Sequence, residues 1–350
     1  MAIATANPLT QYGCHSKGNP AAILALVLER NLISIKFINL FYALLIATTS
    51  GIAWSVWLPY LSGALVLALG LIHPIRNEIA QRHGLDKLIP FGPVFLAVPM
   101  AVFGTFHFTA ARFVVQVVPA WMPGHLFWVY FVGAALIAAA LSIVLEKQVW
   151  LSATLLGVML LLFVLLLHIP RLIAAPDRFN LAVALRDLAF SGGAFAIAGA
   201  QTKPWPARVA NALLIIARFF IAIPVTVFGV EHFLHPDFVP GVPLDRLMPS
   251  YIPAHLLWSY VTGVVFIAAG LCLIVNKKTQ QAAASVGLLV LILVLLVYVP
   301  ITVTFLSDIA NGLNYLVDTL ALSGAAYSLA LAQRERLSTP RHRVQASIRT

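Results

Sequence analysis

The stretch PAWMPGHLFWVYFVG at residues 119–133 returns as PSYIPAHLLWSYVTG at residues 249–263, and this repeat decides the fold. Self-similarity at a fixed shift is typical of a chain built from internal repeats. Proline, histidine, tryptophan, tyrosine and glycine recur with a constant shift of 130 residues: Pro123, His125, Trp128, Tyr130 and Gly133 match Pro253, His255, Trp258, Tyr260 and Gly263.

The similarity continues on both sides of this stretch. Upstream, His107 matches His232 at a shift of 125, so the second copy has five extra residues before the repeated stretch. Downstream, Ser191 matches Ser323 at a shift of 132. The chain therefore contains a tandem duplication, which covers roughly residues 90–200 and 210–333.

The composition is that of an integral membrane protein. Of the 350 residues, 61% are hydrophobic and only 10% are charged, and the mean hydropathy of +0.94 lies far outside the range of soluble globular domains. A run of about 20 apolar residues spans a bilayer as a helix. Four such runs are predicted in each copy, at residues 91–110, 125–145, 149–170 and 181–201, then 209–232, 254–275, 282–303 and 313–333.

Another apolar run precedes the first copy. It extends from Phe37 to Ile75 and is interrupted near Trp57, Leu58 and Pro59, which predicts two short spans joined by a tight turn. We therefore expect ten membrane helices, with eight as the minimum. The residues before this run include charged positions and lack the pattern of a cleavable signal peptide.

The predicted fold is an all-α integral membrane protein with two four-helix bundles in parallel tandem repeat and an N-terminal helical hairpin. Because each copy has an even number of helices, both copies cross the membrane in the same orientation, around a pseudo-twofold axis along the membrane normal. The predicted segments are a cytoplasmic N-terminal segment at 1–35, the hairpin at 36–76, the first repeat at 88–202, the second at 208–333, and a basic disordered tail at 334–350.

The net charge of +10 fits this topology. Most lysines and arginines fall at one end of the predicted helices, whereas the other end collects most of the aspartates. The positive-inside rule then places both termini in the cytoplasm, in a multi-pass protein of the cell inner membrane. The cations predict contact with anionic membrane lipids and no nucleic-acid partner. Only Cys14 and Cys272 are present, so a disulfide framework or a thiol relay is excluded.

Histidine and tryptophan side chains gather at the outer ends of the predicted helices. They suggest a shared outer pocket between the copies for a quinone head group, a small oxidised compound or a lipid. The alternative is that these rings occupy the membrane interface, where amphipathic aromatic side chains are enriched. The candidate histidines are His107, His125, His232 and His255, and Trp128 and Trp258 lie three residues after His125 and His255, on the same helix faces.

Polar residues elsewhere in the apolar runs are further candidates. His168 ends the third helix of the first copy, and Asp318 opens the fourth helix of the second copy. Arg218 lies well inside an apolar helix, where it is either functional or extends its side chain back to the lipid head groups. Glu231 and His235, with His232, come nearest to metal-ligand spacing, but no His-x-x-x-His pair or cysteine cluster supports a metal site.

Two motifs recur in both copies, Phe-Gly-x-x-His-Phe and Pro-x-x-x-Pro-x-His-x-x-Trp-x-Tyr-x-x-Gly, and the fourth helix of the first copy opens with Arg-Asp-Leu-Ala-x-Ser-Gly-Gly. In these motifs the chain resembles the DoxX-like family of small four-helix membrane proteins, over about two thirds of its length. The second copy adds the first-helix arginine, Arg218, where the first copy has Pro93. Glu231 likewise stands where the first copy has Phe106, so these differences point to the second copy as the place to look for function.

The resemblance implies a connection with thiosulfate:quinone oxidoreductase and with thiol and oxidative-stress complexes. The chain would then be a membrane subunit of a quinone- or sulfur-linked redox system, and partner subunits would supply electron transfer. The alternatives are a binding or transport protein for a lipid or small solute, and a structural membrane partner without a catalytic site. Because phosphate-binding Gly-rich loops and nucleophile or zinc-protease motifs are missing, a primary ATP-driven transporter is excluded for this chain alone.

Overall fold

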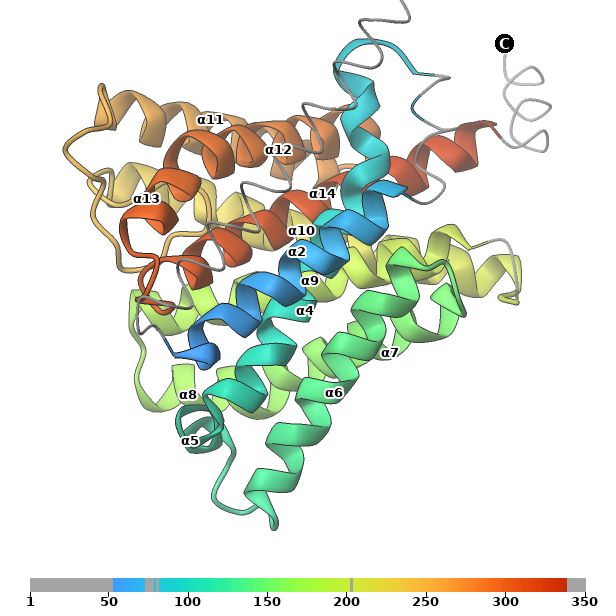
Figure 1. The fold of residues 1–350 in the computed structure, drawn as a ribbon. Helices are drawn as coiled ribbons and strands as arrows, with labels where there is room; N and C mark the ends of the chain where they lie inside the picture. Colours follow the sequence, from blue (N-terminus) through green and yellow to red (C-terminus); the bar gives the residue numbers. More distant parts are fainter. Residues whose placement is uncertain (1–52, 73–78, 80–81, 202–203, 339–350) are drawn as a thin grey trace, which may run out of the picture. The chain divides into compact units, whose positions relative to one another are not determined.

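The computed structural model describes residues 53–72, 79, 82–201 and 204–338. From Trp54 onward these residues belong to one compact unit. They are helical apart from connecting turns and one isolated antiparallel bridge between Phe238 and Leu247 (Figure 1). Nine helices in this described part are long and apolar enough to cross a membrane, so the chain is a polytopic helical membrane protein. The predicted segment 1–35 and the first half of the predicted hairpin lie outside the described residues.

The elements carry the labels of Figure 1. Of the short elements, η1 and η2 are 3-10 helices, whereas η3 and η4 are π-helical turns inside longer spans. In chain order they are α2 Trp54–Ile72, η1 Gly84–Phe91, α4 Gly92–Thr109, α5 Ala111–Val114, η2 Val115–Val117, α6 His125–Val144, α7 Val149–Phe163, η3 Val164–His168, α8 Ile169–Ala174, α9 Arg178–Ala200, α10 Ala207–Leu234, α11 His255–Ile274, α12 Thr279–Leu293, η4 Val294–Tyr298, α13 Val299–Thr304 and α14 Leu313–Ser338.

All eight spans predicted for the two repeats are confirmed as helices, with their ends shifted by a few residues. The predicted start at residue 125 is confirmed, since α6 begins at His125, and the start predicted at residue 254 lies one residue before His255, the first residue of α11. Each start follows a residue in the left-handed conformation, Gly124 with φ 69° and Ala254 with φ 56°, which turns the chain sharply into the helix.

The predicted break near Pro59 is wrong. α2 runs without interruption through Pro59, which lies in its second turn and is buried. Proline removes only the hydrogen bond to the carbonyl of Ser55, at the very start of the helix. In membrane proteins, packing by neighbouring helices makes such an interruption tolerable, and α2 packs on α4.

The third helix of each repeat continues past a proline and beyond its predicted end at residue 170 or 303. α7 passes through η3 into α8, and α12 passes through η4 into α13, so the spans reach Ala174 and Thr304. Each π turn accommodates one extra residue, and Pro170 and Pro300 then occupy the first turn of the next segment, where a missing N–H costs little. α14 likewise extends to Ser338, into the segment predicted as a disordered tail.

The helices pack as a ring around a shared core. In Figure 1, α4, α9, α10 and α14 lie between α6 and α7 on one side and α11 and α12 on the other. Within each predicted repeat, the first helix packs on the second and the third on the fourth. The fourth helix of each repeat, however, packs on the first helix of the other repeat, α9 on α10 and α14 on α4, and α9 also packs on α14. One continuous hydrophobic cluster therefore contains residues of both repeats.

Glycines allow the closest of these crossings. A Cβ atom on Gly324 of α14 would lie 2.3 Å from the backbone nitrogen of Leu96 on α4. A Cβ atom on Gly192 of α9 would lie 3.0 Å from Cγ1 of Ile221 on α10. In the sequence alignment Gly192 matches Gly324 and Leu96 matches Ile221, so the two crossings join corresponding positions. In a twofold-symmetric arrangement, if a residue of the first copy contacts a given position of the second, the matching residue of the second copy contacts the same position of the first.

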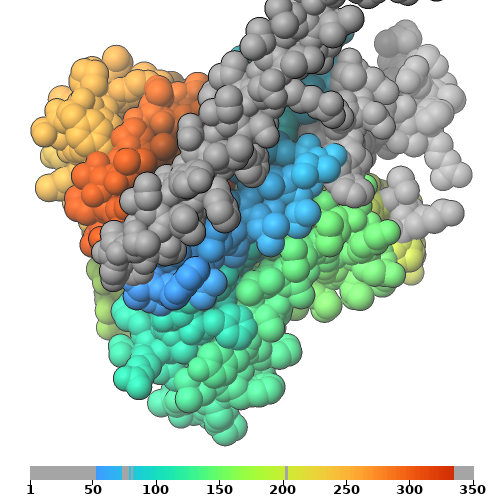
Figure 2. All heavy atoms as spheres, in the orientation of Figure 1, coloured from blue at the N-terminus to red at the C-terminus, as the bar shows by residue number. Residues whose placement is uncertain are grey.

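Apolar side chains cover the outside of the unit as well as its interior. In α2, whose side chains form part of the surface in Figure 2, Trp54 is 64% exposed and Ile72 is 75% exposed. A continuous apolar surface of this kind is unfavourable in water, whereas the hydrocarbon tails of a bilayer solvate it. The exposed side chains therefore agree with helices that cross a membrane.

Candidate functional site

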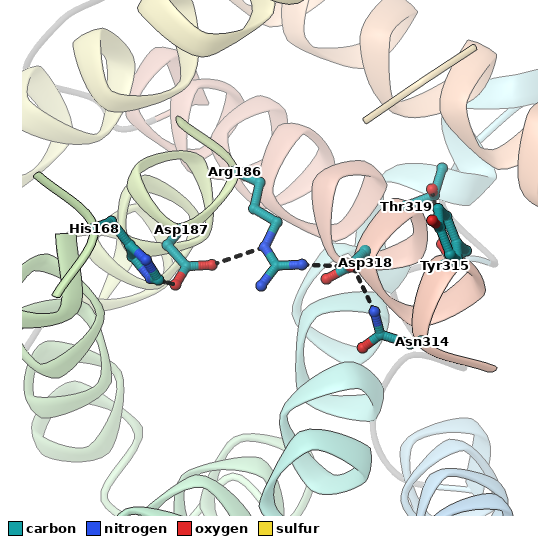
Figure 3. A network of polar contacts seen from close by, with 7 residues as sticks. All are labelled: His168, Arg186, Asp187, Asn314, Tyr315, Asp318 and Thr319. Atoms are coloured by element: carbon teal, nitrogen blue, oxygen red, sulfur yellow. Dashed lines mark hydrogen bonds and ion pairs between the residues drawn. The ribbon is translucent and has the colours of Figure 1, made fainter. Parts of the chain in front are cut away.

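Four ionisable side chains form a hydrogen-bonded row in the middle of the unit (Figure 3). His168 Nε2 lies 2.8 Å from Asp187 Oδ2. Arg186 Nε donates to the other oxygen of Asp187 at 3.1 Å, and Arg186 Nη1 donates to Asp318 Oδ2 at 2.6 Å. The amide of Asn314 contacts the same Asp318 oxygen at 3.4 Å. We call His168, Asp187, Arg186 and Asp318 the central polar row.

Three helical elements bring the central polar row together. His168 closes the π turn η3, where the widened backbone displaces side chains from the ordinary helical positions. Arg186 and Asp187 are consecutive on α9, so they point in directions about 100° apart. Asp187 therefore meets η3 while Arg186 reaches Asp318 on α14, across the contact of α9 with α14. Arg186 lies about 12 Å along α9 from its first residue, well inside the span.

The central polar row is buried and carries unequal charges. The Asp318 side chain is fully buried, Asp187 is 9% exposed and Arg186 is 18% exposed. With both carboxylates ionised, two negative charges would face one guanidinium, so one further proton would make the row neutral. Asp318 Oδ1 is buried and has no hydrogen-bond partner among the described residues. An uncompensated buried charge is costly, and the row therefore favours holding that proton.

The ion pair at the centre of the row joins corresponding positions of the two repeats. Arg186 and Asp318 are 132 residues apart, the same shift that relates Ser191 to Ser323. Gly193 also meets its counterpart, since a Cβ atom on Gly193 would lie 2.6 Å from Cβ of Ala325. At the contact of α9 with α14, the positive Arg186 and the negative Asp318 thus occupy aligned positions of the two copies.

A second cluster is centred on Arg178, at the start of α9. Its guanidinium contacts Asp245 at 2.6 Å and Glu231 at 3.3 Å, and it lies 4.0 Å from the ring centroid of Phe238. His235 lies 3.8 Å from the same glutamate. These contacts attach the loop of residues 235–254 to α9 and α10. The cluster therefore has an evident structural role, and it accounts for Glu231 and His235.

His232 is engaged on both ring nitrogens. Nδ1 makes a short hydrogen bond to the carbonyl of Phe228, and Nε2 accepts the backbone N–H of Gly241 at 2.9 Å. Because a carbonyl only accepts, the proton lies on Nδ1. His232 is buried under the 235–254 loop, so it contributes no free nitrogen to the predicted outer pocket.

Among the described residues, no hydrogen bond joins the other predicted site residues to the central polar row. His107 bonds the carbonyl of Phe103 at 2.7 Å, and Trp128 donates to the carbonyl of Pro123 rather than to His125. His255 is half-buried at the start of α11, and Trp258 packs on the core near Tyr298. Binding by these residues stays a prediction.

Arg218 lies on α10 apart from the central polar row. Its guanidinium lies 4.9 Å from the ring of Phe219, and no ion pair forms with it among the described residues. The sequence-based choice between a functional and a head-group-directed arginine stays open at this position.

Two surface hollows lie away from the row. One of about 480 Å³ is lined by the α6–α7 turn and the end of α9, including Glu146 and Trp150. The other, shallow and open, is lined by Arg112, His125 and Phe127. Within the described residues, no three His, Cys, Asp or Glu side chains are grouped as a metal site would require.

Arg186 and Asp187 are the functional candidates that the sequence analysis missed. Both belong to the Arg-Asp-Leu-Ala-x-Ser-Gly-Gly motif, which was noted for family resemblance alone. A signal was present, because two adjacent charges stand in an otherwise apolar span and an arginine aligns with Asp318 of the other copy. Their partners depend on the packing of α9 on α14, which no local pattern encodes.

Comparison with protein-family models, with curated proteins and with solved structures finds no match to this chain.

Proposed function

We propose that this chain is a DoxX-like membrane subunit of a redox system that acts on a lipophilic carrier of the quinone class. One observation carries the proposal: the central polar row lies within helices that are long and apolar enough to span a membrane, and it ends at His168, beside exposed apolar side chains. Soluble or membrane-bound partner subunits would supply the electrons, because the chain has no redox-active cysteine pair.

Charge supports the role of the row as a site that holds a proton. Ionisable residues inside a membrane are costly and typically mark proton or ion pathways. With Asp187 and Asp318 ionised and Arg186 charged, these three side chains carry one net negative charge, which a single bound proton neutralises. Reduction of a quinone to a quinol takes up two electrons and two protons.

The surroundings of His168 favour a ligand that arrives through the bilayer. The imidazole is 12% exposed. Neighbours in the same segment face outward, with Leu165 48% exposed, Leu166 43% exposed and Ile169 39% exposed. A molecule that reaches His168 along this surface passes apolar side chains, which suits a quinone better than a water-soluble solute.

The proposal includes the origin and orientation of the chain. The repeated motifs and the matching contacts of Gly192 and Gly324 support duplication of a four-helix unit. The distribution of lysine and arginine supports both termini in the cytoplasm and a location in the cell inner membrane, in contact with anionic lipids.

The test is to purify the full chain in mild detergent, extract it with organic solvent and quantify quinone by chromatography and absorbance. We expect quinone in the wild type, a large loss in Asp187→Asn, and retention in the control Asp86→Asn, whose carboxylate is exposed and remote from the row. Equal quinone in both variants would exclude the central polar row as the site. A preparation that carries a lipid or solute and no quinone would instead support the binding or transport alternative.

A further inference from the structure

The 235–254 loop fills a space between the helices of the second repeat. Val239, Met248 and Ile252 of the loop are buried against the end of the third span. The residues that they cover there are sealed, since Leu293, Val297, Tyr298 and Ile301 are each at most 1% exposed. This loop includes the five extra residues that distinguish the second copy from the first.

The backbone of the loop satisfies two polar side chains at the bottom of this space. The N–H of Gly241 donates to His232 Nε2 at 2.9 Å, and the Tyr298 hydroxyl donates to the carbonyl of Pro240 at 2.9 Å. A Cβ atom on Gly241 would lie 3.2 Å from Cγ2 of Thr319. One backbone donor, the N–H of Gly241, and one backbone acceptor, the carbonyl of Pro240, thus lie between the side chains of His232, Tyr298 and Thr319.

The first repeat has different side chains at the corresponding positions. His107 corresponds to His232, His168 to Tyr298, and Asp187 to Thr319, at the shifts of 125, 130 and 132 residues. The shorter connection of the first repeat, residues 110–124, packs on α4 and α6.

Among the residues that the structure describes, the third span of the first repeat lacks the cover found in the second repeat. Leu167 and His168 are half-buried and Arg171 is exposed, whereas their counterparts Val297, Tyr298 and Ile301 are sealed. Within the described part of the chain, the same helical framework is therefore closed by the 235–254 loop in the second repeat and open in the first.

We infer that the space beside His107, His168 and Asp187 binds the head group of a quinol, in the position that the 235–254 loop fills in the second repeat. The inference rests on the quinone class proposed above and deepens it. It also places the ligand in the first repeat, whereas the sequence differences pointed to the second.

The histidine nitrogens that face this space are hydrogen-bond acceptors, so they favour the quinol over the quinone. His107 bonds the carbonyl of Phe103 through Nδ1, so its Nε2 is an acceptor in the neutral ring, as Nε2 of His232 is for Gly241. His168 directs Nε2–H at the carboxylate of Asp187, so its Nδ1 is also an acceptor in the neutral ring. Two acceptors match the two hydroxyl donors of a quinol, whereas a quinone offers only carbonyl acceptors.

A pair of matched tryptophan substitutions tests whether the first-repeat site is open, without any ligand. Val297→Trp enlarges a sealed position and is expected to lower the melting temperature by several degrees, because overpacking a filled core is destabilising. Leu167→Trp, at the corresponding position, is expected to leave the melting temperature within about a degree of wild type, because the side chain has room. Equal losses in the two variants would overturn the inference, since the first-repeat site would then be filled as well.

Binding of decylubiquinol and decylubiquinone to the full chain, measured at pH 8 by equilibrium dialysis in detergent, tests the ligand. We expect one site, with the quinol bound about tenfold more tightly, the effect of one hydrogen bond. His107→Ala and His168→Tyr should each weaken quinol binding at least tenfold. The control Tyr298→Phe, which removes a hydroxyl from the filled site of the second repeat, should leave it unchanged.

The outcomes separate this inference from the proposed function. Binding that is lost in Tyr298→Phe but kept in His107→Ala and His168→Tyr would overturn the inference and leave the quinone class standing. Failure of the wild type to bind either form would overturn the quinone class and this ligand together. The tryptophan pair would still report whether the space in the first repeat is open.

Discussion

Arg186 is held inside the membrane by carboxylates on two different helices. It contacts Asp187 on its own helix and the fully buried Asp318 on α14. A buried ion pair contributes little net stability compared with apolar residues, yet removal of one partner is strongly destabilising because the other charge is left alone. The central polar row therefore affects stability mainly when one charged side chain is removed and its partner is left buried without a counter-charge.

Arg186→Leu is expected to lower the free energy of unfolding by about 3–5 kcal/mol, because it leaves Asp318 buried without its guanidinium. Adding Asp318→Leu should restore part of that loss, with a coupling energy of about 1–3 kcal/mol between the two positions. Unfolding of the purified chain by sodium dodecyl sulfate, followed by circular dichroism, measures both quantities.

Arg218→Leu is the matched control, since it also removes an arginine from a spanning helix. Arg218 forms a cation-π contact with Phe219 and no ion pair among the described residues, so its loss should cost less than about 1 kcal/mol. If Arg186→Leu and Arg218→Leu lowered the free energy of unfolding equally, the ion pair of Arg186 with Asp318 would not be the reason for the loss.

At this scale the sequence predicted some of the row and missed its centre. His168 and Asp318 were candidates because single polar residues at the ends of apolar runs are conspicuous. Arg186 and Asp187 depend on a contact between helices that are far apart in sequence. The role of His232 was also hidden, because its partner Gly241 belongs to a loop without a periodic pattern.

Helices and their connections differ in how well the sequence predicts them. The eight spans of the repeats are long apolar runs bounded by polar residues, so their positions follow from composition alone. Prolines misled the prediction at Pro59 and Pro170, because a proline near a helix start or after a π turn does not end a span. The 235–254 loop, which has the most specific contacts of any connection described, could not be predicted.

Gly241→Ala should loosen this loop. Gly241 has φ +117°, where side chains are strained, and a Cβ atom there would press on Thr319. We expect a loss of about 2–3 kcal/mol and faster proteolytic cleavage within residues 235–254. The control Gly84→Ala also has positive φ, 55°, but no neighbour within 4 Å, so it should cost only about 1 kcal/mol and leave the cleavage unchanged. Similar cleavage of both variants would contradict the close fit of Gly241.

At the scale of the whole described unit, aligned positions of the two predicted repeats meet each other. α9 packs on α10 as α14 packs on α4, and α9 meets α14 at matched residues. This arrangement follows if both repeats have the same orientation in the membrane. The sequence predicted that orientation from the even number of helices, whereas the exchange of helix contacts between the repeats appears only in the structure.

Single cysteines in a chain with Cys14→Ser and Cys272→Ser should reveal that orientation. Trp121→Cys and Tyr251→Cys lie on exposed connections at one end of the helices, and Lys147→Cys and Lys278→Cys lie on exposed turns at the other end. An impermeant maleimide added to intact cells should label the first pair, and the second pair only after the membrane is opened. Labelling of Trp121→Cys without Tyr251→Cys would show that the two repeats have opposite orientations.

The contact between α14 and α4 has a twin in the contact between α9 and α10, but only the latter pair is joined by a short peptide link. Near the unjoined pair, Arg334 Nη1 lies 2.9 Å from Asp86 Oδ2, so the end of α14 comes close to η1. The helix packing from α4 to α14 therefore does not determine which helix must come first in the chain. A circular permutant that starts at α10, connects α14 directly to η1 and ends after α9 would keep every helix contact from α4 to α14.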